Sequence, residues 1–219
     1  RPDANGDAGD RNGVVCGSIE HKMGIHASPT CVMHFNGSTG WLLGKPNAGL
    51  ACMFTMMNQA RLGVGLQGHG LSELAWQASI AYANDRLQGR AMSGVKEPGK
   101  AADPIIVHPD VRRMLLTQKA FVEGGRVLCF LTGREIDSAR LNPDPQARQA
   151  SNDLIAFLTP IVKGFLTEAA MEVTSLAVQI HGGHGFIRQT GVEQLMRDAR
   201  ITPIYEGTNG IQALDLVGR

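Results

Sequence analysis

TPIVKGFLTEAAMEVTSLAVQIHGG, residues 159–183, carries the clearest helical pattern in the chain. Its apolar residues recur every three to four positions, the period of one face of an α-helix: Ile161, Phe165, Ala169, Val173, Leu176 and Ile180. Threonine followed by proline is typical of a helix N-cap and first helical position, and a glycine pair is typical of a helix end. The segment therefore predicts an amphipathic helix that begins at Pro160 and ends before Gly182.

Three earlier segments repeat this helical period, over residues 50–82, 108–139 and 147–158. The first contains GVGLQGHG, residues 63–70, and each of its glycines would weaken an isolated helix by about 1 kcal/mol. We interpret these glycines as places where another helix packs closely; close approach of a cofactor is the alternative. A glycine- and proline-rich loop is expected at 87–104, and a short helix over Val192–Ala199. Four long helices with short connections predict a mainly α fold, an antiparallel four-helix bundle.

The N-terminal part of the chain has a different pattern. Residues 1–12 are polar and are expected to form a loop or a disordered segment. Residues 13–45 contain three short β-prone runs, at 14–16, 30–35 and 41–43, with turn signals between them. Three short strands cannot bury both faces of a sheet. We therefore expect residues 13–45 to be the end of an incomplete β domain and residues 46–219 to be the helical-bundle domain.

Composition narrows the classes of function. A formal net charge of +1 gives no electrostatic basis for binding nucleic acid or an anionic membrane. No apolar run of membrane-spanning length and no signal peptide are evident, and the chain does not begin with Met, so a fragment or a processed product is expected. The four cysteines lack CxxC spacing, which favours buried free thiols in a reducing cytoplasm. The seven histidines match no metal-binding motif, so we expect no metal site.

The candidate chemistry lies near the end of the chain. IYEGTNGIQ, residues 204–212, follows QIHGGHGF, residues 179–186. Glu206 lies at an expected loop-to-helix junction, where a carboxylate can act as a general base. The backbone N–H of Gly207 and the hydroxyl of Thr208 offer hydrogen-bond donors beside it.

Taken together, these motifs resemble those of the acyl-CoA dehydrogenases, a family of flavin enzymes, over nearly the whole chain after residue 12. The ending is most similar to the large branch of that family, which includes the 3-(methylthio)propionyl-CoA dehydrogenases. Members begin with a helical domain and a full β domain whose loops hold the flavin ring, and the large branch has a further C-terminal domain. The resemblance therefore implies that this chain is an internal piece of such an enzyme.

The resemblance also implies roles for individual residues. Glu206 corresponds to the base that removes the α-proton of the acyl thioester, and Gly207 to the backbone donor to its carbonyl. Arg61 matches the family's acyl-CoA-contacting Asp-x-x-Arg, whereas Asn58 departs from its acid. The resemblance implies FAD contacts at two places. Arg86 would reach the pyrophosphate across a subunit interface, and Gln88 follows it in a stretch that departs from the family pattern. Gln179, Gly182 and Gly183 would contact the adenosine part, and Thr208 and Gly210 are further implied FAD contacts.

The implied function is FAD-dependent α,β-dehydrogenation of an acyl-CoA, with the β-hydride passing to flavin N5. Implied partners are the acyl-CoA substrate, an electron-transfer flavoprotein as acceptor, and further copies in a homodimer or homotetramer, in the cytoplasm. Two alternatives stay open. One is a truncated, non-catalytic bundle that does not hold FAD. The other is a DNA-associated flavoprotein relative, which the near-neutral charge disfavours.

Overall fold

The computed structural model describes residues 5–218. Residues 1–4 and Arg219, which fall in the expected N-terminal loop and helical domain, lie outside the described residues. The chain divides into two compact units after Thr55. Its elements are β1 (Val14–Ile19), β2 (Cys31–Phe35), α1 (Gly49–Asp85), the 3₁₀ turn η1 (Ile105–Val107), α2 (Pro109–Leu141), α3 (Pro145–His181), α4 (Gly183–Phe186), the 3₁₀ turn η2 (Arg188–Thr190), α5 (Val192–Ala199) and α6 (Asn209–Gly218).

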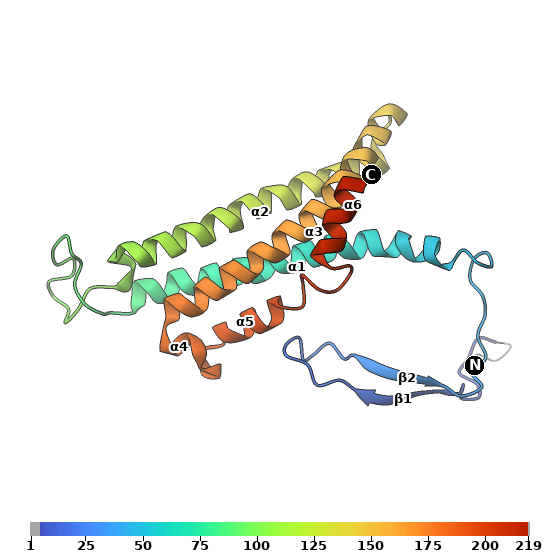
Figure 1. Ribbon diagram of the computed structural model, residues 1–219, viewed down its shortest axis with the longest axis horizontal. Coiled ribbons are helices and arrows are strands. Elements are labelled where there is room, and N and C mark those ends of the chain that lie inside the picture. Colours follow the sequence, from blue (N-terminus) through green and yellow to red (C-terminus); the bar gives the residue numbers. More distant parts are fainter. Residues whose placement is uncertain (1–4, 219) are drawn as a thin grey trace. The chain divides into compact units, whose positions relative to one another are not determined.

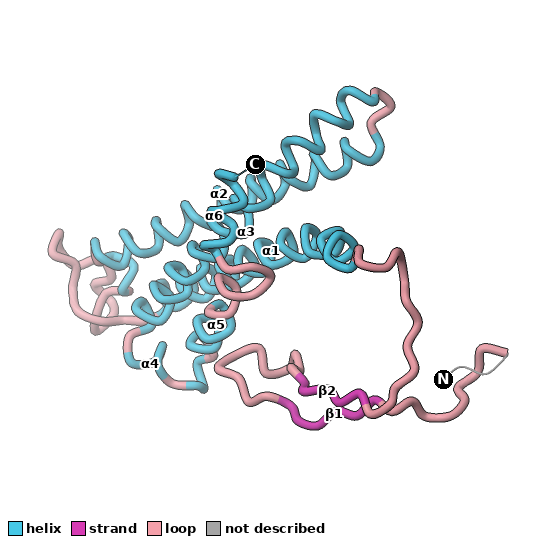
Figure 2. The backbone as a smooth tube through the Cα atoms, turned by 45° about the vertical axis from the view of Figure 1, so that its right-hand side comes forward, coloured by secondary structure: helices cyan, strands magenta, loops and turns pink. Residues whose placement is uncertain are grey.

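The N-terminal unit contains one antiparallel hairpin, drawn in magenta in Figure 2. β1 and β2 pair from Val14 opposite Phe35 to Ile19 opposite Cys31, with a β-bulge between Cys16 and Ser18. Every residue of both strands is exposed, so neither face of this two-stranded sheet is covered. Such a sheet is marginal by itself, and the assignment of residues 13–45 to an incomplete β domain stays a prediction.

The prediction of a third strand at residues 41–43 is wrong. Trp41, Leu42 and Leu43 are exposed and belong to no strand. A strand forms only where a neighbouring backbone completes its hydrogen-bond ladder, and β-propensity alone does not supply that neighbour.

The C-terminal unit is mainly helical, as predicted. α2 runs antiparallel both to α1 and to α3 (Figure 1). The shorter helices α4, α5 and α6 pack against α3, which therefore lies at the centre of the bundle. The core contains two clusters of buried residues: one of Ala83, Ile105, Met114, Leu115 and Ile180, and one of Ala75, Val173, Ala177 and Val192.

One predicted helix boundary is wrong, because α3 continues through Pro160. The Thr159 hydroxyl does not cap a helix N-terminus; it donates to the carbonyl of Ile155, one turn earlier, at 2.7 Å. Proline removes a single backbone hydrogen bond, and the turns on both sides bury Leu158 and Val162 in the core. The helix starts instead at Asp144-Pro145, where the Asp144 carboxylate accepts from the N–H of Gln146 at 2.9 Å.

The interpretation of the α1 glycines is confirmed at two positions. A Cβ atom on Gly65 would lie 2.7 Å from Cγ1 of Val162, and one on Gly68 would lie 2.9 Å from the carbonyl oxygen of Leu166. Glycine is needed there because the α1 backbone approaches α3 closely. Gly63 and Gly70 meet no neighbour, so their hydrogen side chains are not required by packing.

Two expectations from composition concern a membrane span and the cysteines, and only the expected burial of the cysteines is wrong. α3 is long and apolar enough by length and composition to span a membrane, with a mean hydropathy of 1.5 over its most apolar window. Half of that window is buried inside the bundle, as in the core helix of a globular domain. The cysteines are free, as expected, but Cys16, Cys31 and Cys52 are exposed rather than buried.

Candidate functional site

The loop between α5 and α6 carries Glu206, the candidate base (Figure 1). Glu206 has φ of 56° and Gly207 has φ of 84°, so two consecutive residues are left-handed. A left-handed conformation costs a non-glycine residue about 1–3 kcal/mol and persists only where surrounding contacts fix it. The Glu206 side chain is half-buried at this turn.

Side chains of α6 hold this turn. The Gln212 side chain, which is 2% exposed, donates to the carbonyl oxygens of Gly207 at 3.1 Å and Glu206 at 3.4 Å. The Thr208 hydroxyl accepts from the N–H of Ile211 at 3.3 Å, which is an N-cap contact for α6. Gly210 lies exposed in the first turn of the same helix.

Arg61 of α1 lies directly behind the Glu206–Gly207 turn. The residue is 5% exposed, and its guanidinium pairs with the Asp215 carboxylate of α6 at 2.9 Å. A Cβ atom on Gly207 would lie 3.8 Å from its Nη2. Asn58, one turn earlier, is exposed and lines a separate groove of about 520 Å³ between α1, α2 and α3. The two residues expected to contact substrate therefore lie in different places: Arg61 is buried beside the Glu206–Gly207 turn, and Asn58 is exposed in the groove.

Two residues that the motifs did not indicate, Lys163 and Asn209, complete this end of the site. Lys163 is fully buried in α3, and its Nζ donates to Oδ1 of Asn209 at 2.8 Å. Burial, and then the charge of Arg61, lower the pKa of Lys163, while Glu168 and Glu206 oppose this. A lysine inside the apolar pattern of residues 159–183 and an asparagine directly after Thr208 were the available signals.

The buried atoms Nε of Arg61 and Oε1 of Gln212 have no hydrogen-bond partner within residues 5–218. Buried polar atoms of native proteins are normally satisfied by protein, water or ligand. Two such atoms belong to residues that contact the Glu206–Gly207 turn, so a buried water or a ligand atom would satisfy them.

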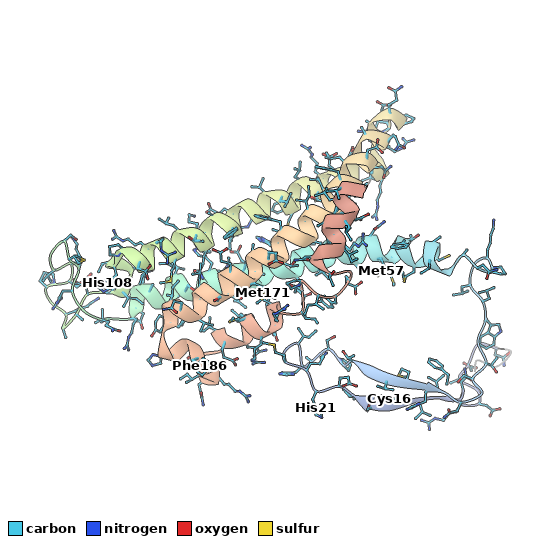
Figure 3. All side chains as sticks on the ribbon, viewed as in Figure 1. Cys16, His21, Met57, His108, Met171 and Phe186 are labelled. Atoms are coloured by element: carbon cyan, nitrogen blue, oxygen red, sulfur yellow. The ribbon has the colours of Figure 1, made fainter. Side chains whose placement is uncertain are left out.

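The remaining expected cofactor residues gather at the other end of the bundle. The side chains of Arg86, which follows α1 directly, and of Gln179 in the last turn of α3 are exposed. Gly182 ends α3 with φ of 58°, and a Cβ atom placed on it or on Gly183 would have no neighbour within 4 Å, so their backbone is open to close approach. Gln88 is also exposed, and its carbonyl hydrogen-bonds Nε2 of His108 at 2.8 Å. Figure 3 labels His108 and Phe186 at this end.

Tyr82 joins the ends of α1 and α3. Its ring stacks on His181 with centroids 4.3 Å apart, and its hydroxyl hydrogen-bonds Nδ1 of His184 at 3.2 Å. Burial lowers the pKa of His181, which keeps this ring neutral beneath the tyrosine. These contacts hold the end of α1, where Arg86 follows Tyr82 by four residues, against the end of α3.

The two groups of site residues are far apart within one chain. Tyr82 follows Arg61 by 21 residues on the same helix, which corresponds to roughly 32 Å at 1.5 Å per residue. No three His, Cys, Asp or Glu side chains cluster as metal ligands anywhere in residues 5–218. The chemistry offered is a carboxylate base at one end and an arginine beside open glycine backbone at the other.

Comparison with known proteins identifies the relatives of this chain. The family model of the acyl-CoA dehydrogenase C-terminal domain matches residues 47–219. A 3-methylmercaptopropionyl-CoA dehydrogenase from Ruegeria pomeroyi is 53% identical over 98% of this chain, and a broad-specificity linear acyl-CoA dehydrogenase from Mycobacterium tuberculosis is 37% identical over the same share. This chain spans 36% of the length of each.

Solved structures agree with the sequence relatives. Butyryl-CoA dehydrogenase from Megasphaera elsdenii superposes with a TM-score of 0.76 and 29% identity, covering 94% of this chain and 48% of that one. The match of the family model over most of the chain, together with these relatives, shows that the chain belongs to the acyl-CoA dehydrogenase family.

Proposed function

We propose that this chain supplies the C-terminal helical domain and the general base of an FAD-dependent acyl-CoA dehydrogenase. The observation that carries the proposal is the Glu206–Gly207 turn: a half-buried carboxylate on a left-handed turn, fixed by Gln212 and backed by Arg61. Strained backbone that is held by several contacts is typical of functional sites.

In the proposed reaction, the Glu206 carboxylate takes the proton from the α-carbon of the acyl thioester. The backbone N–H of Gly207 donates to the thioester carbonyl, which makes that proton more acidic. FAD, held by the residues named below, would supply the acceptor for the hydride that leaves the β-carbon. We propose that Arg61 and Asn58 contact the acyl-CoA, with the Arg61 guanidinium held in place by its ion pair with Asp215.

The residues at the far end fit the diphosphate and adenosine parts of FAD. The exposed Arg86 guanidinium can pair with a pyrophosphate, and the open backbone at Gly182 and Gly183 allows a ligand to approach closely. We propose that Arg86, Gln88, Gln179, Gly182 and Gly183 bind this part of the cofactor and that Thr208 and Gly210 lie near the flavin.

The separation of the two ends supports an oligomer. A flavin whose ring meets Glu206 would have to extend along α1 for roughly 32 Å before its pyrophosphate came near the Tyr82 end of that helix. We infer that Arg86 serves the FAD of a neighbouring copy in a homodimer or homotetramer. Exposed apolar side chains on α2, among them Leu116, Val127 and Phe130, provide surface for such contacts.

The relatives provide candidates for the substrate and the electron acceptor. The Ruegeria pomeroyi relative is named for 3-methylmercaptopropionyl-CoA, so this thioester is the first substrate to test. We propose an electron-transfer flavoprotein as the acceptor and the cytoplasm as the location. A DNA-associated role has less support, because the net charge is only +1.

The test uses a full-length enzyme in which this chain replaces the matching segment of the Ruegeria pomeroyi relative. A panel of acyl-CoA thioesters is assayed with an artificial electron acceptor for the unaltered enzyme, for Glu206→Gln and for the control Glu172→Gln, which changes an exposed acid of α3. We expect dehydrogenation by the unaltered enzyme and the control, and none by Glu206→Gln with FAD still bound. Turnover by Glu206→Gln within tenfold of the unaltered enzyme, only about 1.4 kcal/mol of barrier, would contradict the assignment.

A further inference from the structure

The buried lysine of α3 is unusual in its environment. Lys163 has no exposed surface, and the hydrogen-bond acceptor that its ammonium reaches is the side-chain amide of Asn209. Transfer of an ammonium into a protein interior is strongly unfavourable unless hydrogen bonds and nearby charges compensate. Such a group is expected to be retained where it has a structural or functional task.

Asn209 uses both ends of its amide. Oδ1 accepts from Lys163, while Nδ2 donates to the Glu168 carboxylate at 2.9 Å, to the Thr167 hydroxyl at 3.0 Å and to the Gly164 carbonyl at 3.3 Å. An amide can accept from the ammonium and donate to the carboxylate at the same time, whereas a carboxylate in its place could only accept. The first residue of α6 is thereby fixed to one stretch of α3.

This anchor adjoins the turn that carries the candidate base. The N–H of Asn209 donates to the carbonyl of Pro203 at 3.0 Å, which closes the loop that contains Glu206. Gln212, one turn further along α6, holds the carbonyls of Glu206 and Gly207. The left-handed turn is therefore tied to α6, and α6 is tied to α3.

We propose that Lys163 and Asn209 are positioning residues that lock the N-terminus of α6 to α3 and thereby hold the Glu206 carboxylate in its reactive place. Neither group takes part in proton transfer; each acts through the backbone of residues 203–209. The proposal rests on the assignment of Glu206 as the general base.

The first test measures the loop in the 219-residue chain itself. Amide hydrogen exchange is followed in residues 203–212 for the unaltered chain, Lys163→Met, Asn209→Ala and the control Lys119→Met, which alters an exposed lysine of α2. We expect exchange in this segment to rise at least tenfold in the first two variants and to stay unchanged in the control, with α1 and α2 protected throughout. Unchanged exchange in folded Lys163→Met and Asn209→Ala would overturn the proposal.

Folding failure does not block this test. Methionine replaces the buried lysine with an apolar side chain of similar length, a kind of change that proteins often tolerate. Asn209 is only half-buried, so Asn209→Ala leaves the core unaltered. Asn209→Asp is a further variant: it keeps an acceptor for Lys163 but places a second carboxylate beside Glu168, so we expect it to loosen the loop as well.

The second test distinguishes a role in positioning Glu206 from a role in stabilising the fold as a whole. In the full-length enzyme, we expect Lys163→Met and Asn209→Ala to lower kcat by ten- to a hundredfold, with KM and FAD content within twofold of the unaltered enzyme. Variants with a loosened loop and unchanged kcat would overturn the positioning role. If Glu206→Gln stayed active, the proposed base would be wrong. The amide exchange data would still show whether Lys163 and Asn209 hold the N-terminus of α6 to α3.

Discussion

The two ends of the helical unit differ in how their candidate residues are held. Around Glu206, buried side chains fix the loop through contacts within the chain: Gln212, Arg61, and Lys163 with Asn209. At the other end, Arg86, Gln88 and Gln179 have exposed side chains on a surface held by Tyr82 and His181. If the proposed roles hold, one chain fixes the position of its own base, whereas we infer that the proposed FAD-binding end is completed by other parts of the enzyme.

The largest expected effect concerns the 219-residue chain without its surroundings. We expect a folded helical unit that self-associates, binds little or no FAD and has no dehydrogenase activity. The hairpin exposes both faces, and in the family a full β domain holds the flavin ring. The measurement is a visible spectrum of the purified chain with added FAD, followed by an acyl-CoA assay. A yellow, active protein would show that the chain by itself forms both the site around Glu206 and the FAD-binding site.

A smaller effect is expected at the cofactor end of the full-length enzyme. Arg86→Ala should weaken FAD binding by about tenfold or more, since a charge-assisted contact to a pyrophosphate contributes about 1.5–3 kcal/mol. The melting temperature of the apoenzyme should stay within about 1 °C, because the Arg86 side chain is exposed. Arg113→Ala, at an exposed ion pair of α2, is the matched control. A lower melting temperature with unchanged FAD affinity would make Arg86 a structural charge.

The smallest effect is a pH dependence of stability at the same end. Burial, and to a lesser extent the charge of His184, lower the pKa of His181 below its usual 6.5, while its hydrogen bond to the Ala177 carbonyl opposes the shift. As the pH falls below 6.5, the unfolded chain takes up this proton before the folded one does, so the free energy of unfolding should fall. Urea unfolding of the 219-residue chain at about pH 7.5 and about pH 5.0 measures the change.

His181→Gln should reduce that pH dependence, whereas His21→Gln, which alters an exposed histidine, should leave it unchanged. Equal pH dependence in the unaltered chain and in His181→Gln would contradict the burial argument for this ring.

Much of this architecture could be predicted from local patterns. The short helix Val192–Ala199 has the predicted bounds, and the glycine pair ends α3 as expected. The error at Pro160 arose because the Thr-Pro signal of a helix start also fits a proline that packing tolerates inside a helix. The same kind of signal, Asp144-Pro145, marks the true start of α3, and no local rule distinguishes the two.

The contacts of the site were less predictable. Glu206 and Gly207 were recognised from a motif, but the ion pair of Arg61 with Asp215 joins residues 154 positions apart. The contact of Lys163 with Asn209 joins α3 to α6 and likewise depends on tertiary packing. Hydrophobic periodicity reports which face of a helix is buried, and it carries no information on which polar groups meet inside the core.

We propose that Glu206 removes the α-proton, and isotope exchange measures that step without relying on the electron acceptor. The full-length enzyme is incubated with the acyl-CoA substrate in D₂O, and deuterium at the α-carbon is followed by mass spectrometry. We expect deuterium incorporation by the unaltered enzyme and by Glu172→Gln. For Glu206→Gln we expect the rate of incorporation to fall at least a hundredfold, within the range that a general base contributes. Incorporation by FAD-loaded Glu206→Gln at a rate within tenfold of the unaltered enzyme would contradict the proposal.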